Sequence, residues 1–193
     1  MTSKLTTDLI SREGLAPLVA MREQGTVPAG AATLDLLARC SILALGAAAD
    51  VTRRRECGDE ARIHIPRAPV ASDGVSVIDA RTLARGTALL RHIATLRLTG
   101  AKGLCIVIDF GALGLEIAQV ALSFGATDLA GPIASRRGLP LVDHDDQRKL
   151  VKRREIAAFV ERAGFRPVFI AAESRAESAV TSNDGASRPH VDS

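Results

Sequence analysis

The sequence predicts an α/β protein: a partial (βα) barrel-like parallel sheet of about four strands, preceded by a helical lead-in. Segments with strand and helix patterns alternate between residues 61 and 171, which is typical of parallel strands joined by right-handed crossovers. The 193 residues are too few for a closed eight-stranded barrel, which takes ~250. We therefore expect a helical lead-in over 1–60, a barrel-like domain over 61–171 and a disordered tail over 172–193, where Ser, Ala and charged residues show no apolar period.

Helical patterns dominate the first sixty residues. A helix is expected from Ser11, a good capping residue, to Met21, with Pro17 as an awkward interior residue. Apolar residues at helical spacing predict a second helix over Thr33–Cys57, with Ser41 or Gly46 as a possible kink.

In the barrel-like domain, apolar patterns typical of strands alternate with those typical of helices, and Gly and Pro separate them. The run LCIVIDF is continuously apolar, as expected for a strand buried on both faces, and Asp79 is placed to cap a helix. The expected elements, in order, are a strand at 61–65, a loop at 67–74, a helix from 79 to about 100, a strand at 104–110, a helix at 114–124, a strand at 127–131, a helix at 146–163 and a strand at 167–171.

Composition excludes several classes of protein. A net charge of +3 with scattered basic residues, and 3% aromatic residues with no Trp or Tyr, argue against a nucleic-acid partner. The three cysteines match no metal-binding spacing, and their odd number favours free thiols in the cytoplasm. No apolar run approaches the ~20 residues that span a bilayer, so we expect no membrane contact.

Four segments carry a resemblance to a known family: LGAAADVTRRRECGDEARIHIPR (45–67), ALLRHIATLRL (88–98), LEIAQVALSFGATDLAGPI (115–133) and REIAAFVERAGFRPVFI (154–170). They resemble the radical S-adenosylmethionine enzymes that make menaquinone through futalosine. Aminofutalosine synthase is the most similar member, with dehypoxanthinyl futalosine cyclase and the deazaflavin FO synthase subunits as relatives. The resemblance implies a barrel, an S-adenosylmethionine cofactor and a [4Fe–4S] cluster bound by a CxxxCxxC loop after the first strand.

The chain departs from that family at the positions that matter for its chemistry. Arg67 is followed by APVASDGVSVIDA, which contains no cysteine. The family's D-G-T-V becomes Ala130–Ile133, and its P-V-x-R-D becomes Pro167–Ile170 without the arginine and carboxylate. Without three thiolates on one loop the cluster cannot be held and cleavage of the cofactor has no electron source, so no cofactor is expected.

The resemblance and the departures together suggest a truncated relative, non-catalytic and either accessory or vestigial in menaquinone biosynthesis. The alternative is a small α/β enzyme or ligand-binding domain without an iron–sulfur cluster, so enzymatic activity stays an open question. A partial barrel exposes sheet edges and an apolar inner face, which predicts a homodimer or a protein partner that covers them.

Two carboxylates are candidates for ligand binding. Asp109 ends the most apolar strand, where parallel α/β folds place functional groups, although a helix N-cap is an equally ordinary role. Asp128 lies in GATDLAG, the most specific part of the resemblance, and can either contact a ligand or cap a turn. Gly131, three residues further on, belongs to the same candidate site.

The remaining candidates have ordinary alternatives. Arg97 lies on a helix within the resemblance, where an external salt bridge would also explain it. Gly114 begins a helix whose N–H groups can bind a phosphate or carboxylate. His64 points away from Ile63 and Ile65 and is a candidate base, with no nucleophile elbow near it. The acidic cluster Asp143–Asp146 suggests capping of the next helix more than a metal.

Overall fold

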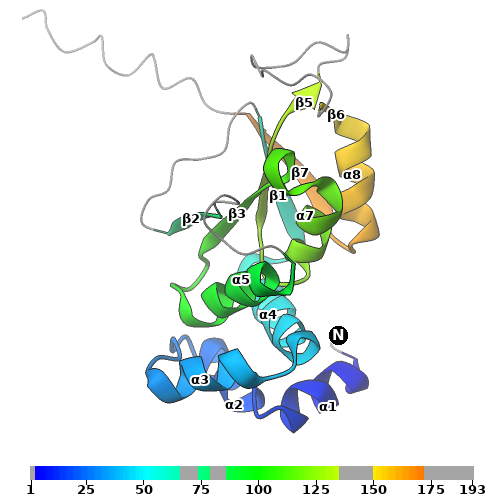
Figure 1. Ribbon diagram of the computed structural model, residues 1–193. Helices are drawn as coiled ribbons and strands as arrows, with labels where there is room; N and C mark the ends of the chain where they lie inside the picture. Colours follow the sequence, from blue (N-terminus) through cyan, green and yellow to red (C-terminus); the bar gives the residue numbers. More distant parts are fainter. Residues whose placement is uncertain (1–2, 66–73, 79–85, 135–149, 172–193) are drawn as a thin grey trace, which may run out of the picture.

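The computed structural model describes residues 3–65, 74–78, 86–134 and 150–171. The amino-terminal helices form one group, and a parallel sheet with its own helices lies next to that group (Figure 1). The helices are α1 (Lys4–Arg12), α2 (Ala16–Glu23), α3 (Ala31–Arg39), α4 (Ile42–Cys57), α5 (Thr87–Thr99), α6 (Phe110–Leu113), α7 (Leu115–Leu122) and α8 (Arg153–Arg162). The strands are β1 (Glu60–Ile65), β2 (Val75–Ile78), β3 (Cys105–Asp109), β4 (Asp128–Ala130), β5 (Ile133–Ala134), β6 (Val151–Lys152) and β7 (Arg166–Ala171).

The main sheet has five strands in the order β2-β3-β4-β1-β7, and each of its pairs is parallel. The predicted fold class, a partial barrel-like parallel sheet with a helical lead-in, is confirmed. The additional strand is β2, which the sequence pattern did not single out because four residues carry little periodicity. Its pairing with β3, from Val75 opposite Cys105 to Ile78 opposite Ile108, makes it a strand.

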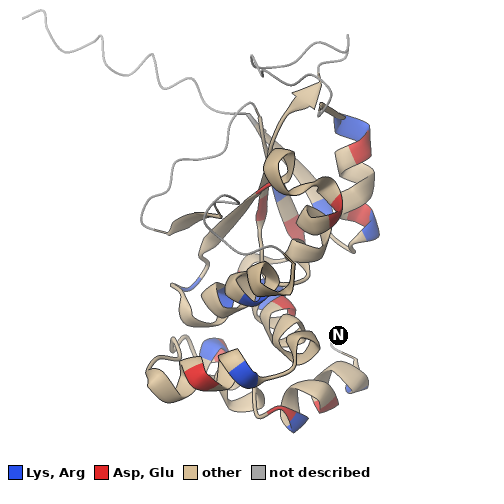
Figure 2. Ribbon diagram, viewed as in Figure 1, with Lys and Arg blue, Asp and Glu red and all other residues tan. Residues whose placement is uncertain are grey.

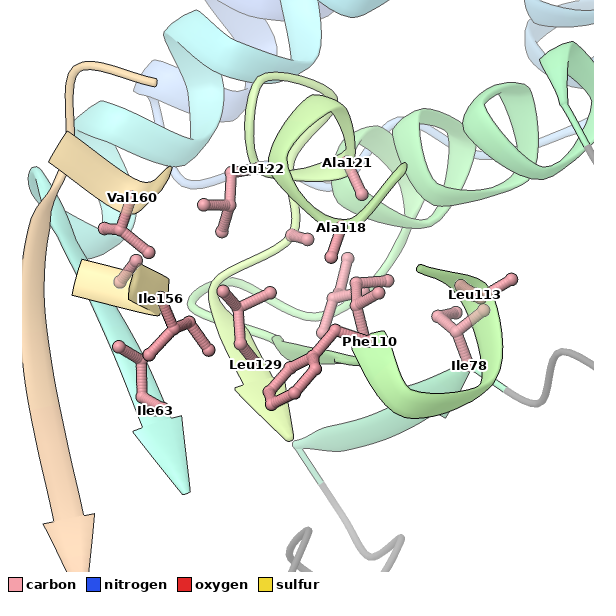
Figure 3. Close-up of a cluster of buried hydrophobic side chains, with 14 of the residues drawn as sticks. Ile63, Ile78, Phe110, Leu113, Ala118, Ala121, Leu122, Leu129, Ile156 and Val160 are labelled. Carbon is pink, nitrogen blue, oxygen red and sulfur yellow. The ribbon is translucent and has the colours of Figure 1, made fainter. Parts of the chain in front are cut away.

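One face of the sheet packs against helices. The strand residues Ile63, Ile108 and Leu129 on this face are at most 1% exposed. They form one hydrophobic cluster with side chains from α5, α7 and α8, such as Leu122 on α7 and Val160 on α8 (Figure 3). We call this the helix face. The alternation predicted for residues 61–65 is explained by this burial, because successive side chains of a strand point to opposite faces.

The opposite face carries polar side chains. Pairing places Arg62 and Val107 beside Asp128, on the face away from Ile63, Ile108 and Leu129. Val107 is fully buried there and belongs to neither hydrophobic cluster of the described residues. We call this the polar face.

The first predicted helix, Ser11–Met21, is wrong. The chain forms two helices instead, because Gly14 between them adopts a left-handed conformation with φ of +73°. Ser3 caps α1 by accepting a hydrogen bond from the N–H of Thr6. Pro17 lies in the first turn of α2, where its missing N–H costs no helical hydrogen bond.

The predicted helix Thr33–Cys57 is divided into α3 and α4 at Cys40–Ser41, one of the two expected kinks. Gly46, the other, lies inside α4, and a Cβ at this position would lie 2.8 Å from the Phe124 ring. Its role is therefore to let α4 approach that ring. A second hydrophobic cluster joins α1–α4 to Ala94 and Leu98 of α5, so the lead-in packs on the sheet domain.

The last predicted strand is placed as expected, since β7 begins at Arg166. The start of the helix predicted over 146–163 is wrong: α8 begins only at Arg153, because residues 151–152 form β6, which pairs with β5. This short pair was not anticipated. Asp79, the acidic cluster at 143–146 and the tail at 172–193 lie outside the described residues. None of the described helices has the length and apolar character that a membrane crossing requires.

Candidate functional site

A buried carboxylate organises the polar face. Asp128 is the first residue of β4 and is fully buried. Arg62 and His64 on β1 form hydrogen bonds with it, and Cys105 on β3 and the adjacent Thr127 are its other polar neighbours. We call these five residues the Asp128 cluster. Parallel pairing of β1, β4 and β3 brings together side chains that lie far apart in the sequence.

Each oxygen of Asp128 has its own strong partner. His64 Nε2 lies 2.6 Å from Oδ1, and Arg62 Nη2 donates to Oδ2 at 2.8 Å. The Arg62 side chain is 40% exposed and that of His64 is 15% exposed. The carboxylate is therefore the fixed centre of the cluster, whereas its two basic neighbours still reach the surface.

The surroundings of Asp128 keep it ionised. Burial by itself would raise its pKa, but hydrogen bonds from His64, Thr127, Cys105 and Arg62 outweigh that effect and lower the pKa below its ordinary value. An ionised carboxylate can only accept hydrogen bonds, so His64 Nε2 carries the proton between them.

Cys105 is held as a thiol. Burial first, and then the negative charge and hydrogen bond of Asp128, raise the pKa of Cys105 to about 12. Because the thiolate is the nucleophilic form of cysteine, Cys105 is a hydrogen-bond donor here and not a nucleophile at neutral pH.

The chemistry available to the cluster belongs to Arg62 and His64. With Nε2 turned to Asp128, Nδ1 of a neutral His64 is free to accept a proton or a hydrogen bond, an arrangement used by general bases. Arg62 uses one of its five N–H groups on Asp128 and can offer others to an anionic group. The cluster can therefore bind a ligand that combines a hydroxyl with an anionic or strongly polar group.

Asp109 and Gly114 make internal contacts. Asp109 Oδ1 accepts hydrogen bonds from the N–H groups of Gly111, at 2.8 Å, and Ala112, at 3.3 Å, so the carboxylate caps the short helix α6. The N–H of Gly114 donates to the carbonyl of Phe110. The N–H group of Gly114, at the start of the helix considered for anion binding, is therefore used within the fold.

Gly131 permits close packing. Its φ is +154°, and a Cβ there would lie 2.7 Å from the Phe110 ring. It follows β4 directly and lies near the Asp128 cluster in sequence, but its role visible in the structure is steric.

Arg97 is buried and not an external salt bridge. Its side chain is fully enclosed, with Nε donating to the carbonyl of Gly125 at 2.9 Å and Nη2 to that of Leu104 at 2.6 Å. Burial lowers its pKa. Its contacts join α5 to the segments before β3 and β4, on the side of the sheet where strands begin.

The residues do not fit the iron–sulfur cluster that the resemblance implies. Cys40 follows α3, Cys57 ends α4 and Cys105 begins β3, so the three thiols belong to three different elements. Within the described ranges, His, Cys, Asp and Glu side chains form no group of three or more suited to a metal ion. No step of a reaction is therefore assigned to such a cluster.

Sequence reasoning identified Asp128 and His64 separately but missed Arg62 and the pairing. The alternation of β1 could have predicted that Arg62 and His64 lie together, because residues 62 and 64 of a strand share the face opposite Ile63. The register that puts Asp128 beside Arg62 is not readable from one strand.

Compared with known protein families, curated proteins and solved structures, the chain matches none of them.

Proposed function

We propose that this protein is a ligand-binding relative of the radical S-adenosylmethionine enzymes of futalosine-dependent menaquinone biosynthesis, that it lacks their radical chemistry, and that it acts as an accessory protein in that pathway. The resembling segments support this, since they fall on β1, α5, α7–β4 and α8–β7 of a parallel sheet. The thirteen-residue stretch after Arg67, which has no cysteine, supports the loss of radical chemistry.

The Asp128 cluster is the observation that carries the binding function. It lies on the sheet face opposite the helices, which in a (βα) barrel is the interior face. A fully buried carboxylate that holds an arginine and a histidine at 2.8 Å and 2.6 Å is a preorganised set of polar groups. Ribosyl compounds with an anionic or amide group, such as futalosine derivatives, offer the hydroxyls and acceptors that these residues can bind.

Isothermal titration with dehypoxanthinyl futalosine, aminofutalosine and S-adenosylmethionine tests this function. We expect one of the futalosine derivatives to bind, and His64→Asn to weaken that binding at least about tenfold, or about 1.4 kcal/mol, a typical value for a hydrogen bond to a charged or strongly polar group. Arg39→Ala on α3, which removes an exposed charge paired only with Asp35, is the matched control.

Two results would contradict the proposal. One is the absence of binding by every compound in the series. The other is a [4Fe–4S] absorbance at one cluster per chain after anaerobic reconstitution with iron and sulfide, because it would restore the radical chemistry.

The proposal includes a protein partner or a second copy that covers the edges of the sheet. Strands β2 and β7 each have one neighbour in the five-stranded sheet, so each has one side without a strand partner among the described residues. Light scattering after size-exclusion chromatography is expected to give a dimer or a complex. A stable monomer that binds no dye for exposed apolar surface would exclude it.

A second candidate function is an iron-free α/β enzyme that uses His64 as a general base. The 2.6 Å contact between His64 and a buried carboxylate favours it, because such a partner orients the imidazole. In this case the bound ligand would be turned over, and His64→Asn would abolish turnover at a ligand concentration that saturates the variant. An unchanged rate in that variant would exclude the base.

A further inference from the structure

A pocket lies at the amino ends of the strands and shares Arg62 and Thr127 with the Asp128 cluster. It has a volume of about 220 Å³ and is lined by Glu56, Cys57, Glu60, Arg62, Gly103 and Thr127. The pocket can therefore hold a small ion or molecule.

Three arginines are buried around this pocket. Arg22 is 3% exposed, and Arg53 and Arg97 are fully buried. Arg53 donates to the carbonyls of Ala126, Gly58 and Glu60, which are residues of the pocket wall or their direct neighbours. Basic segments of α4 and α5 accordingly lie beside each other below the sheet (Figure 2).

Buried negative charge does not match this positive charge. Glu56 accepts hydrogen bonds from Nε of Arg22 at 2.9 Å and from Nη2 at 2.8 Å. Arg97 Nη1 lies 3.7 Å from Glu56 and has no hydrogen-bond partner among the described residues. Burial lowers the pKa of Arg53 to about 10; Cys57 and Asp50 oppose this effect, and repulsion from Arg54 and Arg97 adds to it.

The charged side chains at the mouth of the pocket are paired with opposite charges, and Arg62 is paired with Asp128. Glu60 is paired with Arg166, which is 70% exposed. Arg62 gives one N–H group to Asp128 and is 40% exposed, so it has donors left on the pocket side. An entering anion would meet the free N–H groups of Arg62 and the uncompensated field of the buried arginines behind them.

We propose that this pocket binds a small oxyanion, a carboxylate or an inorganic phosphate, with Arg62 as the contact residue. The pocket shares Arg62 with the Asp128 cluster. The proposal does not need the proposed function, because it takes a compact anion at the amino ends of the strands.

Alkylation of Cys57, which lines the pocket and is partly exposed, provides the readout. Iodoacetate and iodoacetamide react alike: the thiolate sulfur forms a bond to carbon, iodide leaves and the thiol proton passes to the buffer. They differ in charge, so a pocket that attracts anions favours iodoacetate. The ratio of the two rates at Cys57 is measured by peptide mass spectrometry at constant chloride ionic strength, in the folded protein and in urea.

We expect the iodoacetate-to-iodoacetamide ratio at Cys57 to be several-fold higher in the folded protein than in urea. Phosphate or acetate should protect Cys57 from iodoacetamide, and comparing the two anions shows which class binds. Arg62→Met should remove most of the preference, Arg62→Lys should keep part of it, and Arg39→Ala should leave it unchanged.

A folded-state ratio no higher than that in urea, or no protection by either anion, would overturn the proposal. These wild-type measurements decide the matter even if Arg62→Met does not fold. Failure here would leave futalosine binding at His64 intact, and failure of futalosine binding would leave the oxyanion pocket intact, so the two outcomes are distinguishable.

Discussion

The two faces of the sheet are built from alternate residues of the same strands and have opposite chemistry. On β1, Ile63 is fully buried among helix side chains, whereas its neighbours Arg62 and His64 contact Asp128 on the other face. On β4, Asp128 and Leu129 show the same division. The helix face gains stability from apolar area removed from water, and the polar face places buried charge where a ligand can use it.

The largest expected effect is on the helix face. Ile108→Ala removes a fully buried side chain from the hydrophobic cluster and should lower the free energy of unfolding by about 2–5 kcal/mol, because it leaves a cavity. Urea denaturation measures it. Val120→Ala on α7, at a residue 44% exposed, is the control and should change stability by less than about 0.5 kcal/mol. Equal effects of the two substitutions would contradict the assignment of this face as the core.

On the polar face, Asp128→Asn should have a smaller effect on stability. The amide cannot satisfy Arg62 and His64 as the carboxylate does, but both basic side chains reach the surface and can be hydrated. We expect a loss of about 1–3 kcal/mol in the free energy of unfolding, with unchanged circular dichroism. A gain in stability would mean that the buried charge is a net cost to the fold.

The pH dependence of the stability difference between wild type and Asp128→Asn shows whether the charge of Asp128 causes it. Because the folded protein holds the pKa of Asp128 below its ordinary value, the stabilisation is complete above the ordinary carboxyl pKa of about 3.9 and is lost as the pH falls below it. The difference in unfolding free energy between wild type and Asp128→Asn should stay constant from about pH 7 to 5 and shrink below about pH 4. Shrinkage on raising the pH from 5 to 7 would show that the pKa of Asp128 is raised instead.

The smallest effect concerns the reactivity of Cys105. Its pKa of about 12 leaves almost no thiolate at pH 8, so iodoacetamide should label it only after denaturation. Asp128→Asn removes the charge that adds to the effect of burial, and labelling of Cys105 should become faster by up to about tenfold for each pKa unit recovered. An unchanged rate would mean that burial alone protects the thiol.

Local signals predicted the elements best where the pattern was long or had a clear breaker. The apolar run before Asp109 became β3, and the helix before Phe124 became α7. The errors have physical reasons. A proline disrupts the interior of a helix but is compatible with its first turn. Pro17 was expected in the interior of a helix, and it lies in the first turn of α2. The four residues of β2 needed the neighbouring β3 to define them as a strand.

The roles of the candidate residues were predictable where they depend on neighbouring residues in the chain, and not where they depend on tertiary packing. Asp109 caps α6 by accepting hydrogen bonds from two nearby N–H groups, and the sequence had already indicated this capping role as an alternative to ligand binding. Arg97 suggested an external ion pair because arginines on helices are mostly exposed. Its burial depends on carbonyls at Leu104 and Gly125, which only the packing of α5 against the strands brings to it.

By itself the sequence determined the parallel α/β class, most of the strand and helix positions, and the absence of three closely spaced cysteines, because these depend on neighbouring residues in the chain. The tertiary structure decided the sheet order, the burial of Arg97 and the meeting of Arg62, His64, Cys105 and Asp128. Strand register sets those contacts, and register follows from the simultaneous packing of several strands and helices, which no single segment encodes.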